Sequence, residues 1–109
     1  MKLVTAIVQK YDLQNLLQAV VEAGFRATVI DSTGGFLRTG NSTIISAVED
    51  HQVPRLLDII AANCRERTEI VRPDLIGDQA DWYPPRELEV LVGGASVFVL
   101  PVEYFERIV

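Results

Sequence analysis

The chain has 109 residues, of which 49% are hydrophobic and 23% are charged, and its formal net charge at pH 7 is −5. This length predicts one domain spanning residues 1–109, and the composition excludes a disordered tail or a fibre. The excess of acidic residues argues against binding of duplex nucleic acid, because such binding requires a basic face that neutralises phosphates. A domain of this size buries only about two-thirds of its unfolded surface, so self-association would add substantially to its burial.

The chain contains no sign of a membrane span or of an oxidising compartment. No apolar run approaches the roughly 20 residues that a membrane helix needs, and the first eight residues lack the long apolar stretch of a signal peptide. Cys64 is the single cysteine and can form no internal disulfide. We expect it to be a small buried hydrophobic residue in a reducing compartment, and we expect the protein to be cytoplasmic.

The first two predicted elements are a strand and an amphipathic helix. Residues 2–9 are β-branched and apolar without a breaker, which is typical of a strand buried on both faces. Residues 12–23 switch to helical spacing, with Asp12 as the expected N-cap and Gly24 at the C-terminal stop. The apolar stripe of this helix consists of Leu13, Leu16, Leu17, Val20 and Val21.

Two further strands and a second helix follow. Residues 25–32 and 42–48 have strand composition, and they flank a glycine-rich loop at residues 33–41. A helix is expected from Asp50 to Arg65, with Pro54 in its first turn, where a missing N–H costs least. Its apolar face consists of Val53, Leu56, Leu57, Ile60 and Cys64.

The last third of the chain is predicted to contain a short strand, a long loop and a hairpin. Residues 68–71 have strand composition, whereas residues 72–87 are interrupted by prolines and aspartates and are expected to form a functional loop. Residues 88–92 and 95–100 are predicted to pair as a tight hairpin around Gly93-Gly94.

The order of these elements is β-α-β, β-α-β and then the hairpin. Two split β-α-β units with an antiparallel sheet and both helices on one face predict an α+β, ferredoxin-like sandwich. The other face of such a sheet is bare, and residues 2–9 and 95–100 are apolar on both alternating sets. Closed symmetry is the usual way to bury such a face, and packing three sheets around a threefold axis would bury it here, so we expect a homotrimer. The apolar tail at residues 101–109 is expected to dock on another surface.

The sequence contains no arrangement of residues typical of catalysis or of a metal site. There is no paired-carboxylate or Ser/His/Asp pattern, and His51 is the only histidine. Zinc binding or a Cys–His nucleophile would need partners that this chain does not have. We therefore expect His51 to be an exposed residue at the start of a helix and the protein not to be an enzyme.

The most informative motif is the run Thr33-Gly34-Gly35-Phe36-Leu37-Arg38-Thr39-Gly40-Asn41. Phe36 and Leu37 are large apolar side chains within a glycine-rich loop. In one interpretation they anchor the loop to the core or to a neighbouring subunit. In the other they form a platform on which a flat ring stacks, with glycine N–H groups open to a ligand.

Arg26 and Thr28 are candidate phosphate ligands. They share one face of a strand by its period of two, so a guanidinium group and a hydroxyl would point to one place. Asp31 is the only acidic residue between Ala23 and Val48, although a surface salt bridge of Arg26 is the competing interpretation. Asn41 can donate to and accept from the edge of a base, or it can close a turn.

These residues resemble the PII-like cyclic di-AMP receptor family. The resemblance covers nearly the whole chain and is carried by the runs GFRAT at 24–28, TGGFLRTGN at 33–41 and VGGASVFVLPV at 92–102. It implies ferredoxin-like protomers in a homotrimer, with one cyclic dinucleotide in each cleft between subunits and no catalytic activity. Gly24 and Ala47 stand where the family often has Asn and Gly.

The resemblance implies eight ligand-binding positions and no cofactor beyond cyclic di-AMP itself. The first two would hold phosphate, the next three would line the pocket against one adenine, and the following two would read the edge of the second adenine. The last, together with the tail of a neighbouring chain, would close the site. In that order they are Arg26, Thr28, Gly35, Phe36, Leu37, Asn41, Ala47 and Phe98.

Three functions remain in competition. The leading hypothesis is a second-messenger receptor in which binding orders the loops 33–41 and 72–87 and changes the contact with an unidentified protein. The first alternative is a trimeric interaction module without nucleotide, with Phe36 and Trp82 as partner contacts. The second is a PII-type sensor of ATP or ADP, which would normally have a longer loop after its second strand and other basic residues for phosphate.

Overall fold

The computed structural model describes residues 1–31, 40–71 and 88–109, and they form a small α+β fold with two α-helices and two antiparallel sheets. The predicted loop 72–87 lies outside the described residues, as does all of the predicted loop 33–41 except its last two residues. The elements in chain order are β1 (Lys2–Gln9), α1 (Lys10–Glu22), β2 (Thr28–Ile30), β3 (Asn41–Val48), the 3-10 turn η1 (Asp50–Gln52), α2 (Val53–Cys64), β4 (Arg67–Val71), β5 (Leu88–Val92) and β6 (Ala95–Pro101).

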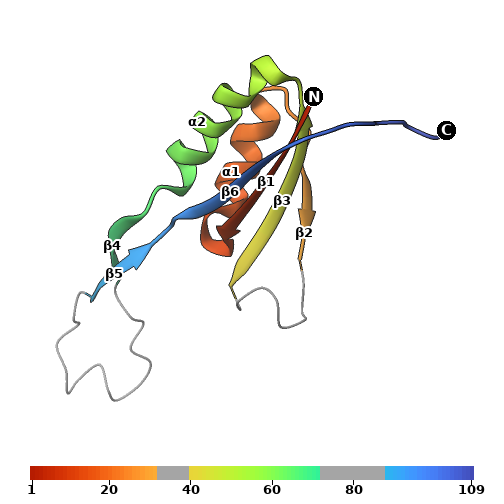
Figure 1. Cartoon of the computed structure of the whole chain (residues 1–109). Helices are drawn as coiled ribbons and strands as arrows, with labels where there is room; N and C mark the ends of the chain where they lie inside the picture. Colours follow the sequence, from red (N-terminus) through yellow and green to blue (C-terminus); the bar gives the residue numbers. More distant parts are fainter. Residues whose placement is uncertain (32–39, 72–87) are drawn as a thin grey trace, which may run out of the picture.

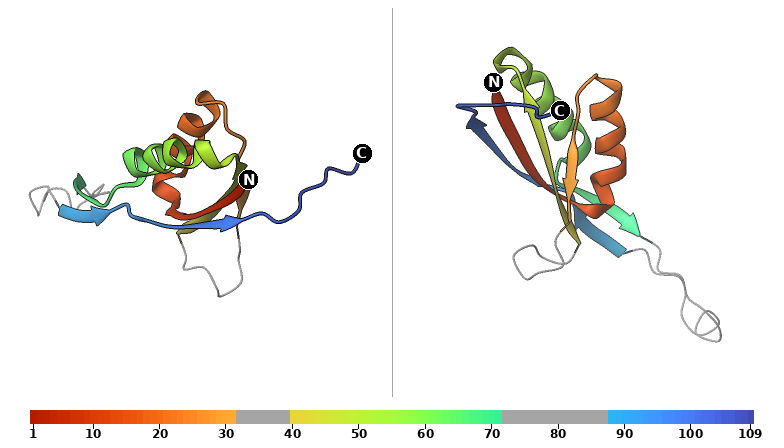
Figure 2. Two further views of the ribbon diagram at one scale, coloured as in Figure 1. Left: turned by 45° about the horizontal axis from the view of Figure 1, so that its top comes forward. Right: turned by 90° about the vertical axis from the view of Figure 1, so that its right-hand side faces the viewer.

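A four-stranded sheet carries both helices on one side. Its strand order is β2-β3-β1-β6, and every neighbouring pair is antiparallel. Figures 1 and 2 show α1 and α2 side by side over one face of this sheet, while no described helix covers the opposite face. The expected antiparallel sheet with both helices on one face is therefore present.

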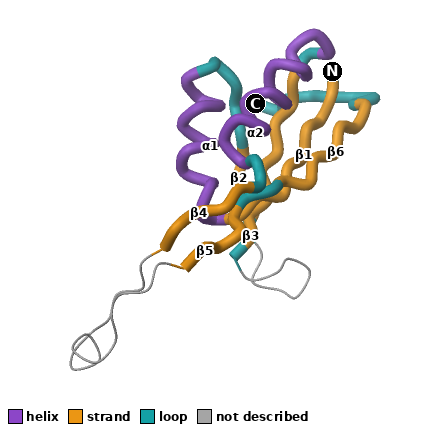
Figure 3. Tube along the Cα trace, turned by 90° about the vertical axis from the view of Figure 1, so that its left-hand side faces the viewer, coloured by secondary structure: helices purple, strands orange, loops and turns teal. Residues whose placement is uncertain are grey.

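The position of the last three strands corrects the prediction. β4, which was expected to be the fourth strand of the sheet, instead pairs with β5 in a separate two-stranded ribbon. The predicted hairpin of residues 88–92 with 95–100 is wrong, because β6 pairs with β1 at the edge of the main sheet. Figure 3 shows the ribbon projecting below the helices, away from that sheet.

Gly93 and Gly94 connect the ribbon to the main sheet. Both have φ of +91°, and a Cβ atom at Gly93 would clash with the carbonyl oxygen of Arg65. The Gly93 N–H donates to the Gln9 side chain at 2.8 Å. The Gly-Gly pair thus permits a close crossing between two sheets and does not form a tight turn between paired strands.

The first helix differs from its prediction at the N-terminus and agrees at the C-terminus. It begins at Lys10, with Gln9 at the N-cap position, so Asp12 lies within the first turn and is 1% exposed. The N-cap prediction for Asp12 is therefore wrong. At the other end Gly24 has φ of +89° and donates its N–H to the Val21 carbonyl, which confirms it as the residue that ends the helix.

The remaining boundaries shift by small amounts. The expected strand 25–32 is regular only at Thr28–Ile30, and the strand expected at 42–48 begins one residue earlier, at Asn41. The helix expected from Asp50 to Arg65 consists of η1 followed by α2. Pro54 lies in the first turn of α2, as predicted.

The core lies between the helices and the sheet. Its buried apolar residues are Val4, Ala6, Val8, Leu16, Val20, Phe25, Ile44, Val48, Leu56, Ile60 and Cys64. β1 is buried on the helix side only, which corrects the expectation of burial on both faces, and Val21 is 64% exposed and leaves the predicted helix stripe. Burial of Cys64 is confirmed, and desolvation raises the pKa of its thiol to about 11. No helix in residues 1–31, 40–71 and 88–109 is long and apolar enough to cross a membrane.

Candidate ligand-binding face

The sheet face opposite the helices, here called the open face, collects most of the predicted site residues that the structure describes. Residues directly opposite each other in an antiparallel ladder lie on the same side of the sheet. One row across this face joins Phe98, Thr5, Ile45 and Thr28. By the same registers, the open face consists of Leu3, Thr5, Ile7, Gln9, Thr28, Ile30, Asn41, Thr43, Ile45, Ala47, Ser96, Phe98 and Leu100.

The open face exposes large apolar side chains along its edges. Phe98 is 53% exposed and Leu100 is 50% exposed on β6, and Ile30 is 43% exposed on β2. Central residues such as Ile7 and Ile45 are half-buried, although none of the described helices covers them. The face is therefore apolar across its width, with threonine hydroxyls interspersed.

Arg26 and Thr28 lie at the β2 edge of this face. Phe25 is buried and Ala27 is half-buried, so the exposed Arg26 side chain between them points outward. Thr28 is exposed and opposite Ile45, and Ala47 lies two residues further along the same face of β3. Arg26 lies before the first pair of this ladder, but its carbonyl accepts from the hydroxyl of Ser46, the residue next to Ala47. Among the ion pairs between described residues, none includes Arg26. The structure thus brings three predicted ligand residues together in one patch.

Two other predicted residues lie apart from this patch within a single protomer. Asn41 begins β3 opposite Gln9, six residues from Ala47, or about 20 Å along a strand. Phe98 lies on β6, at the opposite sheet edge from Thr28 and about three strand spacings away, or roughly 14 Å. Gly35, Phe36 and Leu37 lie outside the described residues.

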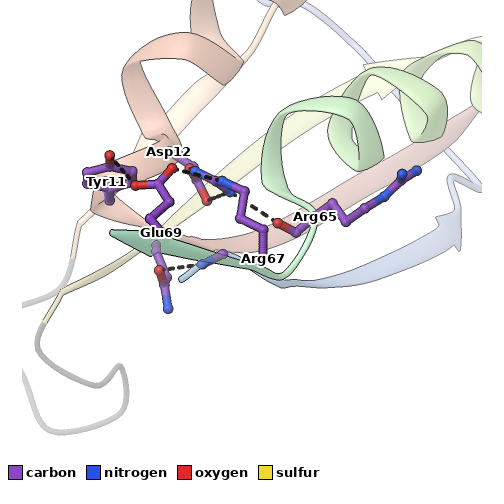
Figure 4. A network of polar contacts seen from close by, with 7 residues as sticks. Tyr11, Asp12, Arg65, Arg67 and Glu69 are labelled. Atoms are coloured by element: carbon purple, nitrogen blue, oxygen red, sulfur yellow. Dashed lines mark hydrogen bonds and ion pairs between the residues drawn. The ribbon is translucent and has the colours of Figure 1, made fainter. Parts of the chain in front are cut away.

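A polar network at the start of α1, which the sequence did not predict, holds the ribbon to the main body (Figure 4). The buried Asp12 carboxylate accepts from the Arg67 guanidinium of β4 at 2.7 Å. Arg67 also pairs with Glu69 at 3.1 Å, and its guanidinium carbon lies 5.8 Å from the centre of the Tyr11 ring. The Tyr11 hydroxyl donates to Glu69 at 2.6 Å, and this hydrogen bond is the main cause of the lowered pKa of Glu69.

The same turn of α1 also contacts the segment that enters β3. The N–H of Lys10 donates to the carbonyl of Gly40 at 2.7 Å. The first turn of α1 is thus bonded both to the base of the β4–β5 ribbon and to the residue before β3. Apolar periodicity identified this turn as a helix start, but no local signal could reveal that Asp12 has its partner 55 residues later.

His51 is exposed in η1, as predicted. In residues 1–31, 40–71 and 88–109, no three His, Cys, Asp or Glu side chains are grouped as metal ligands would be.

The open face and its β2 edge provide a guanidinium group, hydroxyls and apolar surface. These groups suit binding of a ligand that has anionic and flat apolar parts.

The fold and this face define a small α+β protein with one largely apolar sheet face that no described helix covers (Figure 2). The chain belongs to the cyclic-di-AMP receptor family, whose model matches residues 1–108. It is also similar to a protein of unknown function from Pediococcus pentosaceus, known from a crystal structure. The two chains share 39% sequence identity and align over 98% of this chain and 96% of the other, with a TM-score of 0.76. The resemblance to the cyclic di-AMP receptors is thereby confirmed over nearly the whole chain.

Proposed function

We propose that this protein is a cytoplasmic, non-catalytic receptor that binds cyclic di-AMP and transmits its presence to a partner protein. The observation that carries the proposal is the patch of Arg26, Thr28 and Ala47 on the open face of a chain in the cyclic-di-AMP receptor family. The guanidinium group and the threonine hydroxyl would donate to a phosphate. The backbone near Ala47 would face an adenine.

The proposed site lies between subunits of a PII-like homotrimer. Within one protomer, Thr28 and Phe98 occupy opposite edges of the main sheet. If the β2 edge of one copy lies beside the β6 edge of the next, the phosphate-binding residue Thr28 and the aromatic ring of Phe98 lie in one cleft. A closed ring of three copies would repeat this cleft three times and cover the open faces. The strand order β2-β3-β1-β6 also suits a ferredoxin-like protomer, with β6 in the place expected for β4.

The proposal includes a conformational response to the nucleotide. Loops 33–41 and 72–87 would rearrange on binding, and the partner would recognise the rearranged form. Gly40 at the end of the first loop and Arg67 near the start of the second are both bonded to the first turn of α1. This shared contact supports a link between the two loops.

Calorimetry with a panel of mononucleotides and cyclic dinucleotides tests the proposal. We expect cyclic di-AMP to bind with one site per protomer and more tightly than ATP, ADP or cyclic di-GMP. Equal or tighter binding of ATP would contradict the receptor function and favour a PII-type energy sensor. Absence of heat with every nucleotide, checked by equilibrium dialysis with radiolabelled cyclic di-AMP, would favour the interaction module without nucleotide.

A further inference from the structure

Two buried serines on β3 attach the ends of the short strand β2. Ser46 is 4% exposed and donates its hydroxyl to the carbonyl of Arg26 at 2.6 Å. Ser42 is 0% exposed and donates its hydroxyl to the Asp31 carboxylate at 2.7 Å. Both serines belong to the helix-facing set of β3, where the neighbouring buried residues are apolar. A buried hydroxyl at such a position needs a hydrogen-bond partner, and each of these two serines donates to an acceptor that is not part of the regular ladder.

The bond from Ser46 acts where the sheet ladder does not. The paired residues of β2 and β3 begin only at Thr28, so the backbone of Arg26 lies before the first ladder pair. Phe25 fixes this segment from one side by burying its ring. The Ser46 hydroxyl supplies the hydrogen bond that a ladder partner would otherwise make to the Arg26 carbonyl.

We propose that Ser46 is a positioning residue for ligand binding: its hydroxyl holds the Arg26 backbone so that the guanidinium group projects from the open face beside Thr28. This inference rests on the proposed role of Arg26 as a phosphate ligand. A phosphate contact depends on the position of the backbone from which the arginine side chain extends. If that backbone is not fixed, its freedom adds to that of the side chain, and binding must remove both. Ser46 therefore acts from the helix side of the sheet on a contact made at its other face.

The experiment compares variants that differ only in the hydroxyl. Ser46→Thr keeps the donor, whereas Ser46→Val has nearly the same shape and lacks it. We expect Ser46→Thr to bind cyclic di-AMP within about twofold of the wild type and Ser46→Val to bind about three- to tenfold more weakly, the range for one lost hydrogen bond. Ser46→Ala repeats the comparison with a smaller side chain.

A double-mutant cycle separates positioning from a general loss of stability. In an Arg26→Ala background, Ser46→Ala should change the affinity by less than twofold, because the group that it positions is gone. Ser42→Ala is the matched control, since it also removes a buried hydroxyl from the same face of β3. We expect Ser42→Ala to lower the Tm as Ser46→Ala does and to change the affinity equally in both backgrounds.

The carbonyl carbon shift of Arg26, measured by NMR without ligand, reports the contact itself and should move in Ser46→Ala but not in Ser42→Ala. If the wild type binds cyclic di-AMP and Ser46→Val binds as tightly as Ser46→Thr, the positioning role is overturned and the proposed function stands. The same conclusion follows if Ser46→Ala weakens binding fully in the Arg26→Ala background. A wild-type protein that binds no cyclic di-AMP overturns the proposed function first, and the positioning role with it.

Discussion

Arg26 is an exposed cation in a part of the chain that has few charges. Asp31 is the only acidic residue between Ala23 and Val48, and no ion pair among the described residues includes Arg26. Its backbone is nevertheless fixed by the buried Phe25 ring and by the Ser46 hydroxyl. A charged side chain on a fixed backbone without an ion-pair partner in the described residues is better suited to a ligand than to stabilising the fold.

Replacing Arg26 should therefore weaken binding without unfolding the protein. We expect Arg26→Ala to lower the affinity for cyclic di-AMP by more than tenfold, since a charge-assisted contact contributes about 1.5–3 kcal/mol and 1.4 kcal/mol is a factor of ten. Calorimetry gives the affinity, and thermal unfolding should show a Tm close to that of the wild type.

Arg55 provides the control for a general effect of removing positive charge. It is exposed on α2, on the helix side of the molecule. Arg55→Ala should leave the affinity within about twofold of the wild type, as expected for a screened surface charge. Equal losses in the two variants would show that Arg26 contributes only through the overall charge, and unchanged binding in Arg26→Ala would reject its role as a phosphate ligand.

At the scale of elements, the β4–β5 ribbon is attached to the main body through few contacts. Asp12 from α1 and Arg67 from β4 form the principal polar link, and Gly93 bonds to Gln9 where the ribbon meets β6. Exposed apolar residues on the ribbon, such as Ile70 and Leu91, add no packing to the main core. The ribbon is therefore held by a small set of polar contacts, among which the ion pair of Arg67 with the buried Asp12 is the principal one.

The two halves of this ion pair should respond differently to substitution. Arg67→Ala leaves the Asp12 carboxylate buried without its partner, which costs about 3 kcal/mol for a carboxylate in such a position. Asp12→Asn leaves a side chain that can still accept a hydrogen bond from a partly exposed Arg67, so we expect a clearly smaller loss. Urea unfolding of both variants measures the difference.

The pair Arg67→Ala and Asp12→Asn also tests whether the ribbon depends on the link. Hydrogen exchange should rise in β4 and β5 of Arg67→Ala while β1 and β3 retain their protection. Equal stability of Arg67→Ala and the wild type would show that water or other groups satisfy Asp12 without the arginine. Loss of protection throughout the main sheet would show that the link stabilises the whole fold and not the ribbon alone.

At the scale of the whole molecule, the described residues of one protomer expose two apolar surfaces. The first is the open face, with Phe98 and Leu100 half exposed. The second is the segment after β6, where Tyr104 is 76% exposed and Phe105 is 64% exposed. Figure 1 shows this C-terminal segment running away from the sheet, beyond the hydrogen bond from the Val102 N–H to the Met1 carbonyl. Exposed apolar surfaces of this extent are typical of subunit interfaces.

A homotrimer without ligand is the corresponding prediction. Light scattering at micromolar concentration should give a mass three times the 12.1 kDa of one chain. Ile45→Glu places a charge in the middle row of the open face and should give a folded monomer that binds no cyclic di-AMP.

Val21→Glu is the matched control for Ile45→Glu, because it also replaces an apolar residue with glutamate, at a 64% exposed position on α1. It should remain trimeric. A monodisperse wild-type monomer would contradict both the trimer and the cleft between subunits. Trimeric Ile45→Glu would show that the open face is not the interface.

Much of the protomer follows from its sequence. An unbroken run of β-branched and apolar residues identified β1, strand composition identified β3, and apolar residues repeated about every 3.6 positions identified α1 and α2. Gly24 could also be predicted from local sequence as the end of α1, because a positive φ at a helix end favours glycine. The family followed from motifs, and the matched family model confirms it over residues 1–108.

Only the tertiary structure decided which strand completes the main sheet and what Asp12 does. β4 and β6 both have strand composition, and local pattern does not show which of them pairs with β1. For the same reason, local sequence predicted a hairpin turn at Gly93-Gly94. In the structure both glycines have a positive φ and connect β5 in the ribbon to β6 in the main sheet. Asp12 had the position of an N-cap, but its partner Arg67 is 55 residues away along the chain. Pairing across such separations depends on the arrangement of the whole chain, whereas periodicity reports only on neighbours in sequence.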